Sequence, residues 1–308
     1  MERLDSGSGV PAALRGGIVA LGNFDGFHLG HQAVVGRAVA RARAEGRPAI
    51  VATFDPHPRR FFQPQAEHFR LTTLDQRERL FAEAGADAMF VFRFDADLAG
   101  LGARGFAEQQ LVRLIGAAGV VTGDDFTFGK GREGDVAALA ALGAELGFSA
   151  EVVPPVMLGG ETVSSTRIRA HLREGRPREA AALLTRPFAI EGVIEGGDRR
   201  GRELGFPTAN MTLANYLRPA YGIYAVRGRL AHGRLLGGVA NLGVRPMFDP
   251  PRELLETYFF DFSGDLYGQT VEVALIDYLR PEAKFDSLDA LMVQMDRDAI
   301  AARAALAI

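Results

Sequence analysis

The chain has 308 residues, of which 47% are hydrophobic and 24% are charged, and its formal net charge is -3. This length and hydrophobic content suffice for two ordinary domains, while the near-neutral charge provides no basic field that would indicate a nucleic-acid partner. The absence of cysteine excludes a disulfide framework, a thiolate zinc site and a cysteine nucleophile.

The first 16 residues contain no apolar run of signal-peptide length, and we assign them no role. No later stretch approaches the ~18 consecutive apolar residues that a membrane helix needs. We therefore expect a cytoplasmic protein without a membrane partner, which the lack of cysteine fits. The sequence gives no indication of self-association.

Short apolar runs alternate with helical patterns from Gly17 to about Glu151. The predicted strands are Ile18–Leu21, Ala49–Thr53, Ala88–Phe92, Val120–Thr122 and Ala150–Val153. The predicted helices between them are His31–Gly46, Arg77–Ala84, Ala103–Ile115 and Val136–Leu146. This alternation predicts right-handed crossovers and a parallel sheet.

The pattern changes in the second half of the chain. Hydroxyl residues at 164–166 predict the start of a helix, and a short helix follows near Pro177–Leu184. The next strands come without helices between them: Phe188–Glu195, Gly222–Gly228, Arg234–Asn241, Leu254–Phe262 and Thr270–Leu279. These strands predict a barrel or sandwich, closed by a helix near Ser287–Leu306. We place the domain boundary near Thr185–Pro187, which gives domains 1–185 and 186–308.

The segment GNFDGFHLGHQ, residues 22–32, joins the first predicted strand to the first predicted helix. His28 and His31 are three residues apart at the helix start and therefore share a face, and Gly30 removes a side chain between them. Ligands bind at the carboxyl ends of strands in parallel sheets, and a helix N-terminus attracts anions. The combination predicts a phosphate site.

Three further segments bear on the phosphate site, and two of them have an alternative structural interpretation. Asp124, Asp125 and Phe126 follow a strand end, so they point into the same crevice. The segment TFDPHP, residues 53–58, is either part of the site or a rigid turn with His57 exposed. The segment SSTRIR, residues 164–169, is either an ordinary capped basic helix or a phosphate-binding one.

A second glycine-rich segment, GDRRGRELGFPTAN, covers residues 197–210. Its glycines permit a loop that wraps a phosphate. Pro207 favours an extended chain, so Thr208 and Asn210 project to the same side. Their oxygens are hard ligands suited to Mg²⁺ on nucleotide phosphates. The alternative is a glycine-rich hairpin with a turn-forming asparagine.

Glu256 lies in the strand pattern LLETYFF, where alternation places it on one face with Leu254 and Tyr258. Such apolar neighbours inside a barrel would make the carboxylate a better proton acceptor near neutral pH. The alternative is an outward-facing glutamate on the strand.

The HxGH signature resembles the Rossmann-like nucleotidyltransferases, and the longer pattern is similar to the bifunctional bacterial riboflavin kinase/FMN adenylyltransferase (FAD synthetase) family. The blocks TFDPHP, GDDFTFGKGREGD, SSTRIR and GRELGFPTAN match it in order. So do YGIYAV, GVANLGVRP, ETYFFDF, DLYG and LRPEAKFDSLDAL. The resemblance covers the chain from Gly17 to the C-terminal helix.

The resemblance implies an α/β protein with an N-terminal Rossmann-like HxGH nucleotidyltransferase domain and a C-terminal six-stranded flavokinase β-barrel. It implies that MgATP phosphorylates the 5′-hydroxyl of riboflavin, and that the phosphate of FMN then attacks the α-phosphorus of a second ATP to form FAD and pyrophosphate. The implied ligands are riboflavin, FMN, FAD, ATP and Mg²⁺.

The resemblance also implies roles for individual residues. The catalytic ones are His28, His31 and Glu256, and the metal ligands are Thr208 and Asn210. Nucleotide binding falls to Gly22, Asn23, Phe24, Asp25, Gly30, Ser165, Thr166, Arg169, Gly201, Arg202 and Thr208. Flavin binding falls to Asp55, Pro56, His57, Asp124, Asp125, Phe126 and Arg280, although Arg280 has an alternative role in bracing the C-terminal helix.

Two positions depart from the family pattern, namely Thr127, where a basic residue is frequent, and Met247, where threonine is usual. Three other functions are weighed against the two-step enzyme. They are a kinase with a degenerate adenylylation domain, a flavin-binding regulatory protein, and a nucleotidyltransferase that makes CDP-alcohols. The last leaves the region after Pro187 unexplained.

Overall fold

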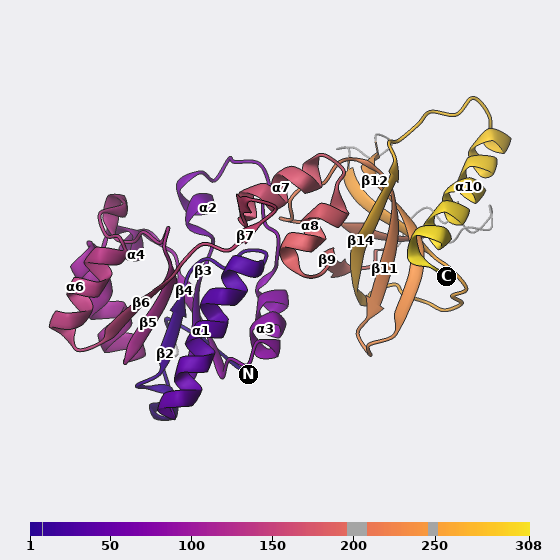
Figure 1. Ribbon diagram of the computed structural model, residues 1–308. Coiled ribbons are helices and arrows are strands. Elements are labelled where there is room, and N and C mark those ends of the chain that lie inside the picture. Colours follow the sequence, from indigo (N-terminus) through magenta and orange to yellow (C-terminus); the bar gives the residue numbers. More distant parts are fainter. Residues whose placement is uncertain (8, 196–207, 246–251) are drawn as a thin grey trace. The chain divides into compact units, whose positions relative to one another are not determined.

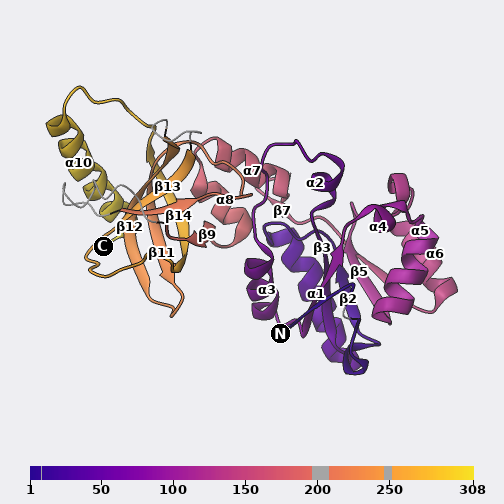
Figure 2. The same cartoon turned by 180° about the vertical axis from the view of Figure 1, so that it is seen from behind.

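The computed structural model describes residues 1–7, 9–195, 208–245 and 252–308. The chain forms two compact units, seen in Figure 1 and from behind in Figure 2. The first contains Met1–Glu67 and Thr73–Ser164, and the second contains His68–Thr72 and Ser165–Ile308. Among the described residues, no helix is long and apolar enough to cross a membrane.

The first unit is built on a six-stranded parallel sheet with the strand order β1-β4-β3-β2-β5-β6. Its strands are β1 (Glu2–Asp5), β2 (Ile18–Leu21), β3 (Ala49–Asp55), β4 (Ala88–Arg93), β5 (Gly119–Gly123) and β6 (Ser149–Val153). The parallel sheet predicted from the alternating pattern is confirmed. The edge strand β1 was not predicted, because it is only four residues long and mostly polar.

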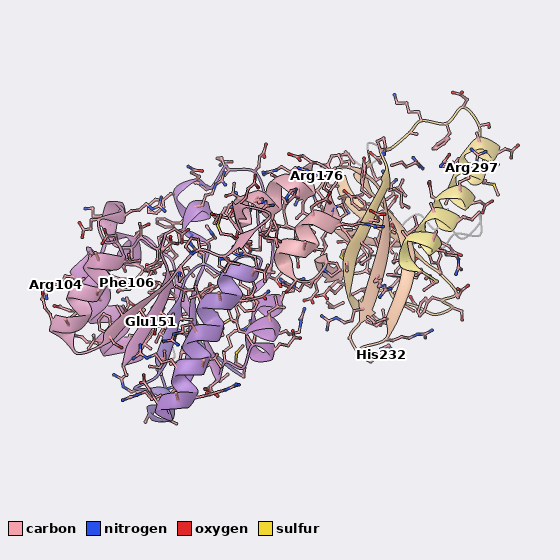
Figure 3. The ribbon with its side chains drawn as sticks, viewed as in Figure 1. Arg104, Phe106, Glu151, Arg176, His232 and Arg297 are labelled. Atoms are coloured by element: carbon pink, nitrogen blue, oxygen red, sulfur yellow. The ribbon has the colours of Figure 1, made fainter. Side chains whose placement is uncertain are left out.

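Helices cover both faces of this sheet. On one face pack α1 (Leu29–Glu45) and α3 (Leu74–Glu83), and on the other α5 (Ala103–Phe106), the π-helix η2 (Ala107–Ile115) and α6 (Val136–Leu146). Phe106 lies in the core whereas Arg104 of the same helix is exposed (Figure 3). The short elements are η1 (Ala12–Leu14), α2 (Pro58–Phe62), α4 (Ala96–Gly100), η3 (Lys130–Arg132), β7 (Met157–Leu158) and β8 (Glu161–Thr162).

The strand order places a switch point beside β2. The chain runs from β2 to β3 and β4 on one side and then returns to β5 on the other side. Connections therefore leave β2 and β5 in opposite directions, and a crevice opens at their carboxyl ends, where ligands bind in open α/β sheets. Leu21 and Gly123 end these two strands.

The second unit begins with α7 (Ser165–Arg173) and α8 (Pro177–Leu184) and continues as a six-stranded antiparallel sheet with the order β10-β13-β12-β11-β14-β9. Its strands are β9 (Phe188–Val193), β10 (Thr208–Thr212), β11 (Gly222–Leu230), β12 (Leu235–Arg245), β13 (Arg252–Phe259) and β14 (Thr270–Arg280). A bridge between Glu195 and Asn210 brings the two ends of the sheet together. The curled sheet confirms the predicted barrel class.

The C-terminal helix α10 (Leu288–Leu306) lies against β11, β12 and β14 (Figures 1 and 2). Ala302 and Leu306 pack on Ala225, Val239 and Tyr258, which are register partners in β11, β12 and β13. Side chains alternate between the two faces of a strand, so the register and these contacts define an α10-facing side of the sheet. The opposite side forms the barrel core.

Candidate active sites

The two histidines of the first motif lie face to face at the start of α1. His28 is the N-cap residue, and its Nδ1 atom accepts a hydrogen bond from the backbone N–H of His31 at 3.4 Å. The ring centroids are 3.6 Å apart with an interplanar angle of 19°. The expected shared face is confirmed, and both imidazoles lie at the positive end of a helix dipole.

Aromatic packing holds this pair in place. Phe24 contacts the His31 ring edge to face at 5.3 Å and the Phe81 ring at 5.7 Å. A Cβ atom at Gly30 would lie 3.2 Å from the His28 ring, and one at Gly22 would lie 3.1 Å from the Phe24 ring. Both glycines are therefore needed for the close approach of these rings.

Arg77 is a buried cation that holds the loop before the histidines, and sequence reasoning did not single it out. It is 3% exposed, and its Nη1 atom donates to the carbonyl oxygen of Asn23 at 3.1 Å and to the hydroxyl of Thr53 at 2.9 Å. Thr53 also donates to the carbonyl of Asn23. A signal was present, because Arg77 is spaced three and four residues from Leu74 and Phe81 on the apolar side of its helix.

The remaining segments predicted for this site follow strands on either side of β2. Asp55 ends β3, and His57 is the N-cap of α2, where its Nδ1 atom accepts from the backbone N–H of Arg59 at 3.1 Å. The interpretation of His57 as merely exposed is therefore wrong. Asp124 and Asp125 follow β5 and are exposed. The sheet order thus brings three loops, residues 22–28, 55–57 and 124–126, to adjacent strand ends.

These loops also hold one buried and one stacked side chain. Asp25 is 4% exposed between Phe24 and Gly26. Phe126 stacks on Phe128 with ring centroids 5.7 Å apart. An exposed aspartate pair next to a stacked aromatic ring suits a ligand with both polar and planar parts.

Ser165, Thr166 and Arg169 lie on α7, which belongs to the second compact unit. Arg169 donates from Nε to the carbonyl oxygen of Phe69 at 2.8 Å, and its guanidinium lies 5.4 Å from the centre of the Phe69 ring. In the first unit, the carbonyl of Val163 lies 3.6 Å from the position of a Cβ atom at Gly30. The chain therefore passes the histidine motif two residues before α7 begins.

Thr208 and Asn210 lie on β10 and share a half-buried face, as predicted, because Ala209 between them and Met211 after them are buried on the other face. The alternative of a hairpin with a turn-forming asparagine is wrong for residues 208–212. Gly201 and Arg202, like Pro207 and Met247, lie outside the described residues.

Glu256 lies between two asparagines. Strand register pairs it with Asn210 of β10 on one side and with Asn241 of β12 on the other. Leu255 and Thr257, its neighbours along β13, are 0% and 1% exposed on the opposite face. Glu256 shares a face with Leu254 and Tyr258, as predicted, but this is the α10-facing side of the sheet and not the barrel core. Sequence reasoning gave Asn241 no role.

A guanidinium fixes the Glu256 carboxylate. Arg245 donates to Glu256 Oε2 from Nε at 2.9 Å and from Nη2 at 2.6 Å, and to Glu282 Oε1 from Nη1 at 3.1 Å. Burial alone would lower the pKa of Arg245, but the hydrogen bonds and charges of Glu256 and Glu282 raise it. Arg245 thus stays charged and orients the Glu256 carboxylate.

Arg280 makes contacts that fit its alternative role, which is to brace the C-terminal helix. Its Nε and Nη2 atoms donate to the two carboxylate oxygens of Asp298 on α10 at 2.8 and 2.5 Å. Gln294 also donates to Asp298. The guanidinium lies 6.0 Å from the Phe285 ring. Arg280 therefore links the end of β14 to the C-terminal helix.

The fold and these sites define a class of protein: a Rossmann-like nucleotidyltransferase unit followed by a flavokinase-type barrel. A family model described as FAD synthetase matches residues 10–167, and one described as riboflavin kinase matches residues 184–306. The chain is 39% identical over 292 residues to the bifunctional riboflavin kinase/FMN adenylyltransferase of Escherichia coli (strain K12), covering 95% of this chain and 93% of that protein.

Two further comparisons cover almost the whole chain. The bifunctional riboflavin kinase/FMN adenylyltransferase of Haemophilus influenzae is 38% identical over 291 residues, with 94% of each chain covered. A solved structure described as a macrolide-efflux protein from Streptococcus pneumoniae aligns with a TM-score of 0.86 and 30% identity over 97% of both chains. The chain belongs to the bifunctional riboflavin kinase/FMN adenylyltransferase family.

Proposed function

We propose that the chain catalyses two successive reactions with ATP as co-substrate. The barrel unit transfers the γ-phosphoryl group of ATP to the 5′-hydroxyl of riboflavin, which yields FMN and ADP. The nucleotidyltransferase unit then joins the phosphate of FMN to the α-phosphorus of a second ATP, which yields FAD and pyrophosphate. The observation that carries the proposal is that the His28–His31 stack and Glu256 lie in different compact units, each with its own family match.

In the first unit, the two imidazoles at the N-terminus of α1 would stabilise the triphosphate as negative charge moves to the leaving pyrophosphate. Gly22, Asn23, Phe24, Asp25 and Gly30 would shape the nucleotide site around them. The family resemblance gives Ser165, Thr166 and Arg169, which belong to the second compact unit, the role of binding the outer phosphates of ATP. The strand-end loops with Asp55, Pro56, His57, Asp124, Asp125 and Phe126 would receive the flavin.

In the second unit, Glu256 would accept the proton of the riboflavin hydroxyl as that oxygen attacks the γ-phosphorus. Gly201, Arg202 and Thr208 would bind the nucleotide, and Arg280 would contact flavin. Arg245 supports this role of Glu256, because its two hydrogen bonds to Oε2 fix the carboxylate in one orientation.

Mg²⁺ fits the polar face of β10. The Oδ1 atom of Asn210 is a buried oxygen with no hydrogen-bond partner among the described residues, and Thr208 shares its face. No group of three His, Cys, Asp or Glu side chains suited to a metal occurs in the described part of the chain, which suits an ion held mainly by substrate phosphates and water. Bound there, Mg²⁺ would neutralise phosphate charge.

We further propose a domain boundary at residues 185 and 186, a cytoplasmic location, and no nucleic-acid or membrane partner. The near-neutral charge supports the absence of a nucleic-acid partner.

Two labelling experiments with the unaltered protein, riboflavin and Mg²⁺ test the two reactions separately. ATP radiolabelled at the γ-phosphate should label FMN first and FAD later, whereas ATP labelled at the α-phosphate should label only FAD. Flavins are separated by chromatography. A flavin pool without γ-label would rule out the kinase reaction, and FAD without α-label would rule out the adenylyl transfer.

A further inference from the structure

Asn241 occupies a defined place in a row of side chains that crosses the barrel. Strand register aligns Asn210, Glu256, Asn241, Ile223 and Arg280 on five adjacent strands. Directly opposed residues in antiparallel strands point to the same face, with Cβ atoms about 5 Å apart. Asn241 is therefore the immediate neighbour of Glu256 on the side away from Asn210.

The side-chain oxygen of Asn241 is buried and has no hydrogen-bond partner in the part of the chain that the structure describes. The Oδ1 atoms of Asn241 and Asn210 are both buried, and neither accepts a hydrogen bond from any described residue. Buried polar atoms in native proteins are nearly always paired, so each exception calls for a ligand, a water or another cause. Two such oxygens on either side of one carboxylate indicate a site that a polar ligand completes.

The order of the row indicates which ligand reaches which asparagine. In phosphoryl transfer the attacking and leaving oxygens lie on opposite sides of the phosphorus. The nucleotide is assigned to the Thr208 and Asn210 end, and Glu256 in the middle accepts the proton. The alcohol then approaches from the opposite end of the row, where Asn241 lies between Glu256 and Arg280.

We propose that Asn241 binds the polyhydroxylated chain of the alcohol substrate, with Oδ1 accepting a hydrogen bond from one of its secondary hydroxyl groups. This inference rests on the proposed kinase reaction. The contact positions the primary hydroxyl beside Glu256 and favours a polyol chain over a plain alkyl alcohol, because an alcohol without that hydroxyl leaves the buried oxygen unpaired.

Substitution of Asn241 tests the contact. Rates of FMN formation are measured for the full-length chain while riboflavin, ATP and Mg²⁺ are varied in turn. Asn241→Ala should raise the KM for riboflavin about 3- to 10-fold, the usual effect of one lost hydrogen bond. The KM for ATP, the half-saturating Mg²⁺ concentration and the rate of FAD formation from added FMN should not change. Asn215→Ala, an exposed position in the same unit, is the matched control.

Riboflavin analogues that each lack one secondary hydroxyl provide a second arm that needs no variant and is unaffected by misfolding. With the unaltered protein, the KM for one analogue should be raised by the same factor as the KM for riboflavin in Asn241→Ala. With that analogue, Asn241→Ala or Asn241→Ser should raise the KM no further. Fluorescence titration of riboflavin binding in the presence of MgADP should show the same pattern.

Three outcomes would overturn the assignment. In the first, the KM for riboflavin stays unchanged in Asn241→Ala. In the second, the Mg²⁺ requirement rises instead, which would make Asn241 a metal ligand. In the third, the increases in KM caused by the analogue and by the variant multiply, which would show that Asn241 does not bind that hydroxyl. Failure of the unaltered protein to form FMN would instead refute the proposed function itself.

Discussion

His28 and His31 form a pair of stacked rings at the N-terminal end of α1, and a glycine lies close to this pair. His28 caps the helix through Nδ1, and Gly30 lies against its ring. The cap, the stack and the glycine occupy four consecutive positions, so a change at either histidine removes one of the two imidazoles proposed to stabilise the triphosphate. Under the proposed function, we expect that loss to affect the rate of adenylyl transfer.

His31→Ala should reduce FAD formation from added FMN by about 10²- to 10³-fold, as removal of one preorganised donor usually does. FMN formation from riboflavin should continue at the original rate. Chromatography of timed reactions measures both. An equal loss of both activities in a folded protein would show that His31 does not act in adenylyl transfer alone.

Arg77 gives a second prediction at the same scale. Arg77→Met should remove the guanidinium donor from the Thr53 hydroxyl and leave the Asn23 carbonyl with the Thr53 hydroxyl as its donor, at a cost of about 1–3 kcal/mol in the free energy of unfolding. The looser loop should also slow FAD formation, whereas FMN formation should not change. Chemical denaturation and the two activity assays check this. Arg93→Met, whose side chain is 82% exposed, is the control and should alter neither quantity.

At the residue scale, the sequence predicts the side chains that lie in contiguous motifs. His28, His31, Thr208 and Asn210 are recognised by short spacing and share faces as expected. Arg77 and Asn241 are distant in sequence from the motifs they serve, so only the strand register or the buried hydrogen bonds identify them. The neighbours of Glu256 on its face, Leu254 and Tyr258, were predicted, but the side of the sheet was not, because alternation along one strand does not say which face forms the core.

The helix α10 is attached to the barrel by a polar contact as well as by apolar packing. Arg280 at the end of β14 makes a two-point contact with Asp298, which is 6% exposed. Ala302 and Leu306, four and eight residues further along α10, pack on the sheet. Both contacts are therefore on one side of the helix.

Asp298→Asn should lower the free energy of unfolding by about 3 kcal/mol, the low end of the range for removing one partner of a buried ion pair. The melting temperature should fall by several degrees. Asp296→Asn, two residues away and exposed, should have no such effect. Equal melting temperatures for the two variants would mean that the Arg280–Asp298 contact does not hold α10.

At the element scale, hydrophobic periodicity predicts the long strands and helices well, because burial on one or both faces leaves a clear repeat. The strand β1 and the helices α2 and α4 were not predicted, since four or five residues carry too little periodicity. The continuous pattern over Ala103–Ile115 predicts one helix, whereas the structure divides it into α5 and the π-helix η2.

At the scale of the whole molecule, each compact unit has buried apolar residues of its own, and the His28–His31 pair and Glu256 lie in different units. Nothing in the described residues requires FMN to remain bound between the two reactions. We propose that FMN is released into solution, because the two sets of residues assigned to the reactions' proton transfer and charge stabilisation lie in different compact units.

Mixing two variants tests that expectation. The Glu256→Ala protein should make no FMN, and the His31→Ala protein should make no FAD at an appreciable rate. Together with riboflavin, ATP and Mg²⁺ they should form FAD, after a delay that shortens as the amount of the Glu256→Ala protein increases. Absence of FAD from the mixture, although each variant keeps its remaining activity, would show that FMN does not pass through solution.

The separation of the two reactions is tested most directly by one measurement, the rate of FAD formation from added FMN and ATP by the Glu256→Ala protein. With Glu256 confined to the kinase reaction, this rate should equal that of the unaltered protein, while FMN formation from riboflavin is abolished. Loss of FAD formation in a Glu256→Ala protein with an unchanged melting temperature would contradict the assignment of the two reactions to separate sites.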